Sequence, residues 1–180
     1  MSPPISLSLA SLAFKSAVVH TVTYFAAGLV AYLAFDYTAL FAEAPFRYFM
    51  RQTTDPIVMA GPLFQPIRGV LFGLAVYLVR DVVFRPRGWV AMWVLLVVIG
   101  ILSTFGPSPG SIEGLIYTTV PLAAHLRGLP EVVVQALLYA LLLHAWVTTR
   151  TRWIGRALVG AFVVALLLPA LGLITLTIDD

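Results

Sequence analysis

The chain has 180 residues, of which 61% are hydrophobic and 11% are charged, with a formal net charge of +3 and no cysteine. An average globular chain is about 45–50% apolar and about 25% charged, and a domain of this size needs more polar cover than this sequence offers. The composition therefore excludes a soluble enzyme, a disordered chain, a disulfide scaffold and a membrane barrel, whose strands alternate in polarity. It is typical of an all-α membrane protein.

Uncharged stretches predict where the chain crosses the membrane. Four stretches lack acidic and basic residues, and each is close to or above the roughly 18–20 residues that span a bilayer core: 16–35, 88–112, 132–149 and 157–178. A fifth apolar segment, 63–84, is interrupted by four polar residues: Gln65, Arg68, Arg80 and Asp81. The sequence thus predicts a single domain over residues 1–180. This domain is a bundle of five transmembrane helices at about 14–36, 63–84, 88–107, 130–149 and 154–177.

Charges between these segments predict the orientation. The side that holds Lys15 and the two arginine-rich turns carries seven basic residues and one acid, whereas the other side carries four basic residues and seven acids. Basic loops stay in the cytoplasm, so we expect a cytoplasmic N-terminus and an external C-terminus. The positive charge fits loop arginines better than a nucleic-acid surface. In a competing interpretation, the first helix is a signal peptide that is cleaved at Ala42-Glu43-Ala44, although Pro45 would follow the cleavage site.

Arg68 is the most informative polar residue of the predicted helices. It lies twelve residues from Arg80, about 18 Å along a helix, and so falls within a hydrocarbon core of about 30 Å. A charge at that depth is costly unless it is paired or faces water. Gln65 lies one turn away on the same face. The sequence favours a paired or cavity-facing Arg68, and the alternative is a side chain that snorkels to the headgroups.

The segment 106–114, Gly-Pro-Ser-Pro-Gly-Ser-Ile-Glu-Gly, predicts an ordered external turn. Ser111 is a candidate N-cap for a short helix through about Thr119, with Glu113 in its first turn. The residues that follow are apolar, so this helix is expected to lie in the interface or to re-enter the membrane. It would either form one wall of a site, with Glu113 paired to Arg68 ahead of Asp36 and Glu131, or be a structured turn on the bilayer surface.

Polar residues gather in the outer half of the predicted bundle, which is the default signature of a binding site. The candidate ligand-binding residues are Arg68, Gln65, Glu113, Asp36, Glu131 and Gln135. Helix starts are also polar simply because they reach headgroup depth, and this interpretation suits Glu131.

Histidines give a weaker signal. His20 and His144 are expected at a similar depth on two helices, where two imidazoles could hold a haem or could simply be interfacial. His125 falls in the external loop, so the sequence predicts no three-histidine metal site. No phosphate loop, Ser-x-x-Lys or His-Glu-x-x-His motif occurs, so we expect neither a cofactor nor a catalytic constellation.

The three segments GPLFQPIRGVLFG (61–73), STFGPSPGSIEGLIYT (103–118) and HLRGLPE (125–131) together resemble a family of bacterial hypothetical inner-membrane proteins. The resemblance covers about the second to fourth predicted helices. It implies a bacterial inner membrane and no particular chemistry.

The sequence favours a non-enzymatic membrane protein that binds or passes a small or lipidic ligand on the outer-leaflet side. The expected partners are the bilayer, such a ligand and other membrane subunits. The alternative is a purely structural subunit that pairs through small residues of the last helix, such as Gly155, Gly160 and Ala161. A membrane-embedded enzyme is the third interpretation.

Overall fold

The structure, a computed structural model, describes residues 7–149 and 151–179, and within these ranges every regular element is helical. Four long helices form the frame: α1 (Leu9–Phe35), α4 (Gly61–Leu78), α9 (Leu129–Thr148) and α10 (Arg152–Asp179). Together with the short α8 (Leu122–Arg127) that leads into α9, they give four candidate membrane spans in the described part of the chain. The all-helical bundle predicted from composition is thus confirmed.

The third predicted helix differs most from the structure. It begins at Gly88 as expected, but α6 (Gly88–Val97) ends in a π-helical turn, η2 (Val98–Leu102), instead of continuing to 107. The apolar helix Gly88–Leu102 is therefore shorter than a full span. The second predicted helix also breaks early, because Val79 separates α4 from the single turn α5 (Arg80–Val83).

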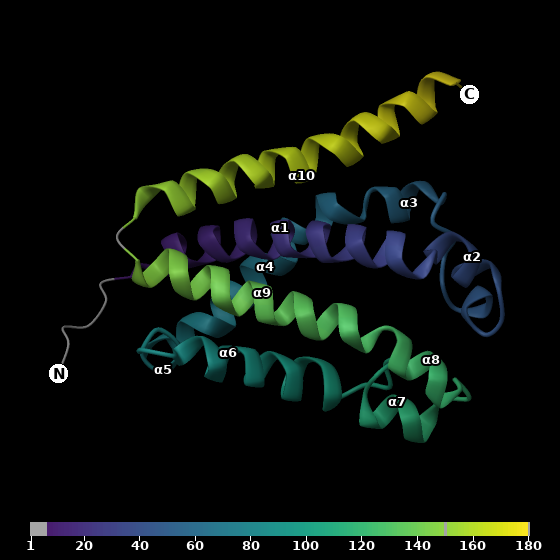
Figure 1. The fold of residues 1–180 in the computed structure, drawn as a ribbon, viewed down its shortest axis with the longest axis horizontal. Coiled ribbons are helices and arrows are strands. Elements are labelled where there is room, and N and C mark those ends of the chain that lie inside the picture. The colour runs from purple at the N-terminus through teal and green to yellow at the C-terminus, as the bar shows by residue number, and fades with distance from the viewer. Residues whose placement is uncertain (1–6, 150, 180) are drawn as a thin grey trace.

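Figure 1 shows how the helices are arranged. α1 lies in the middle of the bundle, with α10 on one side and α9 and then α6 on the other, and α4 packs behind α1. The α5–α6 turn, the end of α9 and the start of α10 lie at the end where α1 begins. The opposite end holds α2 (Tyr37–Ala42), η1 (Phe46–Tyr48), α3 (Pro56–Met59), α7 (Ile112–Tyr117) and α8. The helices therefore run alternately up and down, as the arginine-rich turns predict.

Two glycines bring α4 unusually close to α1. A Cβ atom on Gly69 would lie 2.5 Å from Ala17 Cα, and one on Gly73 would lie 2.8 Å from Ala13 Cα. A Gly-x-x-x-Gly stripe thus faces small residues of α1, and this allows the two backbones to approach closely, as in many membrane helix pairs.

A buried hydroxyl chain ties three helices together at this crossing. Ser16 Oγ donates to the Gly69 carbonyl oxygen at 2.6 Å, and it lies 2.6 Å from Tyr139 Oη. Because Ser16 has a single hydroxyl hydrogen, Tyr139 must be the donor in the second bond. The resulting chain, from α9 through α1 to α4, fixes the relative rotation of the helices that surround the site.

The glycine- and proline-rich turn at 106–114 is built as the sequence predicts. Ser111 is fully buried and caps α7 by accepting from the Gly114 amide at 2.9 Å. Its hydroxyl also donates to Ser108 O. The Gly110 amide donates to His125 Nδ1 at 3.0 Å, and Gly110 itself adopts φ +87°, a conformation that favours glycine. The turn is thereby fastened to α8.

Candidate functional site

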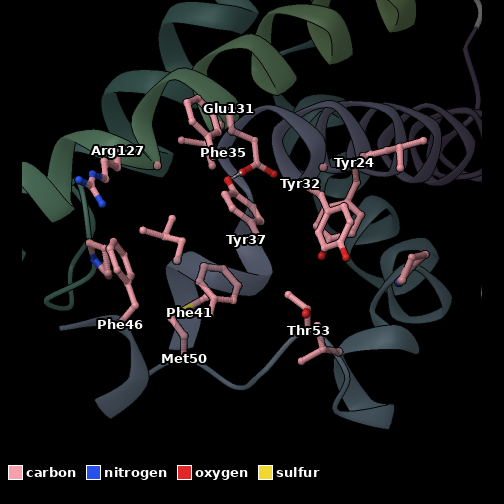
Figure 2. A pocket seen from close by; sticks show the side chains of 18 of the residues that line it. Tyr24, Tyr32, Phe35, Tyr37, Phe41, Phe46, Met50, Thr53, Arg127 and Glu131 are labelled. Atoms are coloured by element: carbon pink, nitrogen blue, oxygen red, sulfur yellow. Dashed lines mark hydrogen bonds between the residues drawn. The ribbon is translucent and has the colours of Figure 1, made fainter. Parts of the chain in front are cut away.

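A cavity of about 1070 Å³ opens at the end of the bundle that carries the connecting segments. It lies between α1, the 37–59 connection, the α8–α9 junction and α10. Ligand pockets usually enclose about 300–1,000 Å³, so this cavity suits a large ligand. Figure 2 shows its interior, with Tyr24 and Tyr32 of α1 on one side and the 37–53 segment on the other.

Aromatic side chains form one wall of this cavity. Consecutive ring centroids along the wall are separated by 4.9–6.2 Å, and the rings belong to Phe35, Tyr37, Phe41, Phe46 and Phe49. Contacts at this spacing add to the free energy gained by burying the rings. The chain can reverse direction after α1 because Asp36 takes the left-handed conformation (φ 45°) and its carboxylate accepts from the Ala39 amide at 3.3 Å. The wall is thus attached directly to α1.

One carboxylate lies inside this largely apolar cavity. Glu131, in the first turn of α9, accepts a hydrogen bond from the Tyr37 hydroxyl (Figure 2). Burial raises the pKa of Tyr37 well above its usual range, and the hydrogen bond to the Glu131 carboxylate raises this pKa further. Gly28 leaves room beside the carboxylate, since a Cβ there would lie 3.7 Å from Glu131 Oε1. Glu131 therefore has both a fixed partner and open space next to it.

A smaller cavity of about 200 Å³ lies beside the first, and Pro109 and Val132 line both. Arg68 of α4 and Gln135 of α9 contribute polar groups to its wall, together with His20. The structure thus brings Arg68 and Gln135 together, as the sequence suggested, but it places Glu131 in the larger cavity.

Gln65 does not line the smaller cavity, but it is hydrogen-bonded to His20, which does. The Gln65 side-chain nitrogen donates to the Gly61 carbonyl oxygen at 3.1 Å, which leaves its Oε1 atom facing His20 Nε2 at 3.1 Å. A carboxamide oxygen only accepts, so His20 Nε2 carries a proton. The His20 ring packs edge-on against Phe72, with 4.8 Å between centroids. Gln65 therefore orients His20 and lines neither cavity.

The expected ion pair of Arg68 does not form. Within residues 7–149 and 151–175, the one ion pair closer than 4.0 Å joins Arg51 and Asp55 at 2.9 Å. Arg68 instead extends over Phe72, with its guanidinium carbon 5.7 Å from the ring centroid. The prediction that Glu113 would pair with Arg68 is wrong, because the chain after η2 turns toward α8 and fastens there.

Besides Gln65, two predicted site residues lie outside both cavities. Asp36 is exposed and caps α2. Glu113 lies in the first turn of α7, where its negative charge interacts favourably with the helix dipole. Both carboxylates therefore support the local backbone.

The histidines do not form a haem site. The hydrogen bond between Ser16 and Tyr139 marks one level at which α1 and the antiparallel α9 lie side by side. His20 lies four residues after Ser16 on α1, and His144 lies five residues after Tyr139 on α9. They are thus offset in opposite directions by roughly 13 Å in total at 1.5 Å per residue. His144 Nε2 donates to the Arg85 carbonyl oxygen at 2.9 Å. A search of the described residues found no group of three or more metal-ligating side chains.

The small-residue stripe expected on the last helix is divided between two environments. A Cβ on Gly155 would meet the Trp146 ring at 2.5 Å, whereas Gly160 faces open space. Gly155 thus packs against Trp146 of the same chain, and Gly160 lies on the outer surface of α10.

Sequence reasoning missed the larger cavity and its aromatic wall. A signal was present, since aromatic residues recur at 35, 37, 41, 46, 48 and 49 in a segment treated as a plain external loop. The site must be interpreted from its own residues: comparisons with protein-family models, with curated proteins and with solved structures found no match for this chain.

Proposed function

We propose that the chain is a non-enzymatic protein of the bacterial inner membrane that binds a lipidic ligand in the larger cavity, on the outer-leaflet side. The observation that supports this function is the size of the cavity, about 1070 Å³, combined with its largely apolar and aromatic lining. An amphipathic ligand with a long apolar part is what such a lining recognises, because apolar burial supplies the affinity and a few polar groups supply the orientation.

The polar groups of the cavity indicate how the ligand would be oriented. The Glu131 carboxylate, bonded to Tyr37, lies toward the α2 side, and the exposed Arg127 lies at the end of α8. The hydroxyls of Tyr24, Tyr32 and Thr53 line the same space. A ligand that carries hydroxyl or amine donors near one end would satisfy Glu131 without exposing the carboxylate to lipid tails.

The proposed topology has five crossings, with the N-terminus in the cytoplasm. Four of them are the long helices, and the fifth is α6 extended by η2. A segment of this length can cross where neighbouring protein or a thinned bilayer accommodates it. α7 then lies at the external interface, and both cavities fall in the outer half of the bundle.

Cavity-filling substitutions on α10 test the proposal. A Cβ on Gly172 lies 3.7 Å from Met59 Cε at the cavity wall, whereas Gly160 on the same helix faces open space. Wild type, Gly172→Leu and Gly160→Leu would be purified from native membranes in a mild detergent, and the lipids that they retain would be measured by native mass spectrometry.

We expect wild type and Gly160→Leu to retain the same lipidic species at equal occupancy, and Gly172→Leu to retain less than about a tenth of it. Equal retention by all three proteins would contradict the proposal. Retention of a membrane protein by wild type, without a bound lipid, would favour the structural-subunit interpretation instead.

A further inference from the structure

The smaller cavity has two hydrogen-bond donors that the protein itself does not use. Arg68 reaches it from α4 and Gln135 reaches it from α9. Among the described residues, neither the Arg68 guanidinium nor the Gln135 carboxamide makes a hydrogen bond, and Arg68 forms no ion pair. Two helices therefore bring donors without a protein partner to the wall of one cavity, Arg68 as an exposed side chain and Gln135 as a half-buried one.

An unpaired cation at this position is costly. Arg68 is exposed on α4 within the candidate membrane span Gly61–Leu78, where a charged side chain normally pairs or faces water. The Phe72 ring offers a cation–π contact, which stabilises the charge without neutralising it. Neutralising the Arg68 charge requires an anion. A guanidinium binds a phosphate through two parallel N–H···O bonds.

Another part of the cavity wall is shaped by a backbone irregularity. Gly100 and Ile101, which belong to the π turn η2, line the same cavity as Arg68 and Gln135. A Cβ on Gly100 would meet no atom within 4 Å. Single π turns inside helices are frequent at functional sites, and this one leaves the space open where a regular helix with a larger residue would fill it.

The volume and the charge of the cavity select the kind of anion. At about 200 Å³, the cavity is several times the roughly 30 Å³ share of one water molecule, so it accommodates a phosphate group but no acyl chain. Arg68 supplies a single positive charge, which matches the single negative charge of a phosphodiester.

We propose that the smaller cavity is a phosphate-binding site in which Arg68 and Gln135 are the donors. The phosphate belongs either to the headgroup of a membrane phospholipid or to a free anion. This inference does not depend on the ligand of the larger cavity, because the two sites use different polar residues.

Binding measurements in dodecyl maltoside, a detergent without phosphate, test the site. Three probes are used: phosphatidylglycerol with two oleoyl chains, diacylglycerol with the same chains, and inorganic phosphate. Native mass spectrometry gives adduct occupancy as a function of probe concentration. The variants are Arg68→Gln, which removes the charge, and Gly100→Leu, which adds a bulky side chain at a lining position on η2. Matched controls are Arg47→Gln, an exposed arginine of η1, and Gly160→Leu.

We expect phosphatidylglycerol to bind wild type and both controls, and to bind Arg68→Gln and Gly100→Leu at least about tenfold more weakly, since a hydrogen bond to a charged group is lost in the first case. Diacylglycerol should not distinguish the variants. The same dependence seen with inorganic phosphate would assign the site to a free anion. Equal binding of both phosphate probes by wild type and by Gly100→Leu would overturn the proposal, even if Arg68→Gln failed to fold.

Discussion

Gly69 is a residue at which the α1–α4 contact leaves no room for a side chain. Its missing side chain lets the α1 backbone approach, since an added Cβ would lie 2.5 Å from Ala17 Cα. We expect Gly69→Ala to lower the free energy of unfolding by about 1–3 kcal/mol, as overpacking does in other cores. Thermal unfolding in detergent, followed by tryptophan fluorescence, measures the change.

The control for this substitution is Gly160→Ala on α10, where the added methyl group meets nothing within 4 Å. Its unfolding temperature should equal or slightly exceed that of wild type, because alanine has the higher helix propensity. If both variants unfolded at the same temperature, α1 and α4 could not be packed as closely as described.

Tyr37 gives a second prediction at the residue scale. Its hydroxyl donates to the Glu131 carboxylate, and hydrogen bonds to charged groups contribute about 1.5–3 kcal/mol. Tyr37→Phe should therefore lower the unfolding temperature, while Tyr117→Phe, at an exposed position of α7, should not. A wild-type unfolding temperature in Tyr37→Phe would show that this bond contributes nothing.

The pH dependence of the same pair has a defined sign. Burial and the Glu131 carboxylate raise the pKa of Tyr37 in the folded chain, whereas an unfolded tyrosine ionises near pH 10. The contribution of the Tyr37–Glu131 hydrogen bond to the free energy of unfolding is thus complete below about pH 10. It is lost as the pH rises toward the pKa of Tyr37 in the folded chain. The difference in unfolding temperature between wild type and Tyr37→Phe should shrink above pH 10; a difference that grows would contradict the assignment.

At the scale of elements, the external turn shows what local sequence can predict. A serine followed by a glutamate two residues later and an apolar run indicated a capped helix, and Ser111 does cap α7. Capping depends on atoms three residues apart, so neighbouring residues suffice to predict it. Four of the five predicted spans correspond to long apolar helices of the structure, since length and composition decide such spans.

The partner of Arg68 could not be predicted in the same way. Its surroundings depend on which face of α4 meets α1, and that rotation is set by Gly69, Gly73 and the Ser16–Tyr139 bond. The stripe Gly69-x-x-x-Gly73 was visible in the sequence and would have indicated the contact face. The π turn after Val97 gave no comparable signal; beyond it, Glu113 lies half-buried in the first turn of α7.

The turn also carries a prediction. Ser111 Oγ accepts from the Gly114 and Ser108 amides and donates to the Ser108 carbonyl. Loss of an N-cap serine costs about 0.5–2 kcal/mol, so Ser111→Ala should destabilise the chain by at least that amount. Amide hydrogen exchange across 108–118 would locate the effect, with Ser103→Ala at an exposed position as the control. Unchanged exchange in Ser111→Ala would show that the cap does not hold the turn.

At the scale of the whole molecule, the helices alternate in direction, and the short helices α2, α3, α7 and α8 gather at one end of the bundle (Figure 1). The end with the arginine-rich turns is expected in the cytoplasm. A reporter that fluoresces only in the cytoplasm should be active when inserted within 85–88 and inactive when fused after Asp180. Fluorescence of the Asp180 fusion would contradict the proposed topology, in which five crossings start from a cytoplasmic N-terminus.

The central claim is that the space between α1, α9 and α10 is filled by a lipidic ligand. A crystal structure of the protein, purified from native membranes and crystallised in a lipidic phase, tests it most directly. We predict elongated non-protein density along the aromatic wall, with a polar end near Glu131 and the Tyr37 hydroxyl. A structure in which α10 closes onto Met59 and Gly28, leaving no cavity or one that holds water alone, would contradict the account.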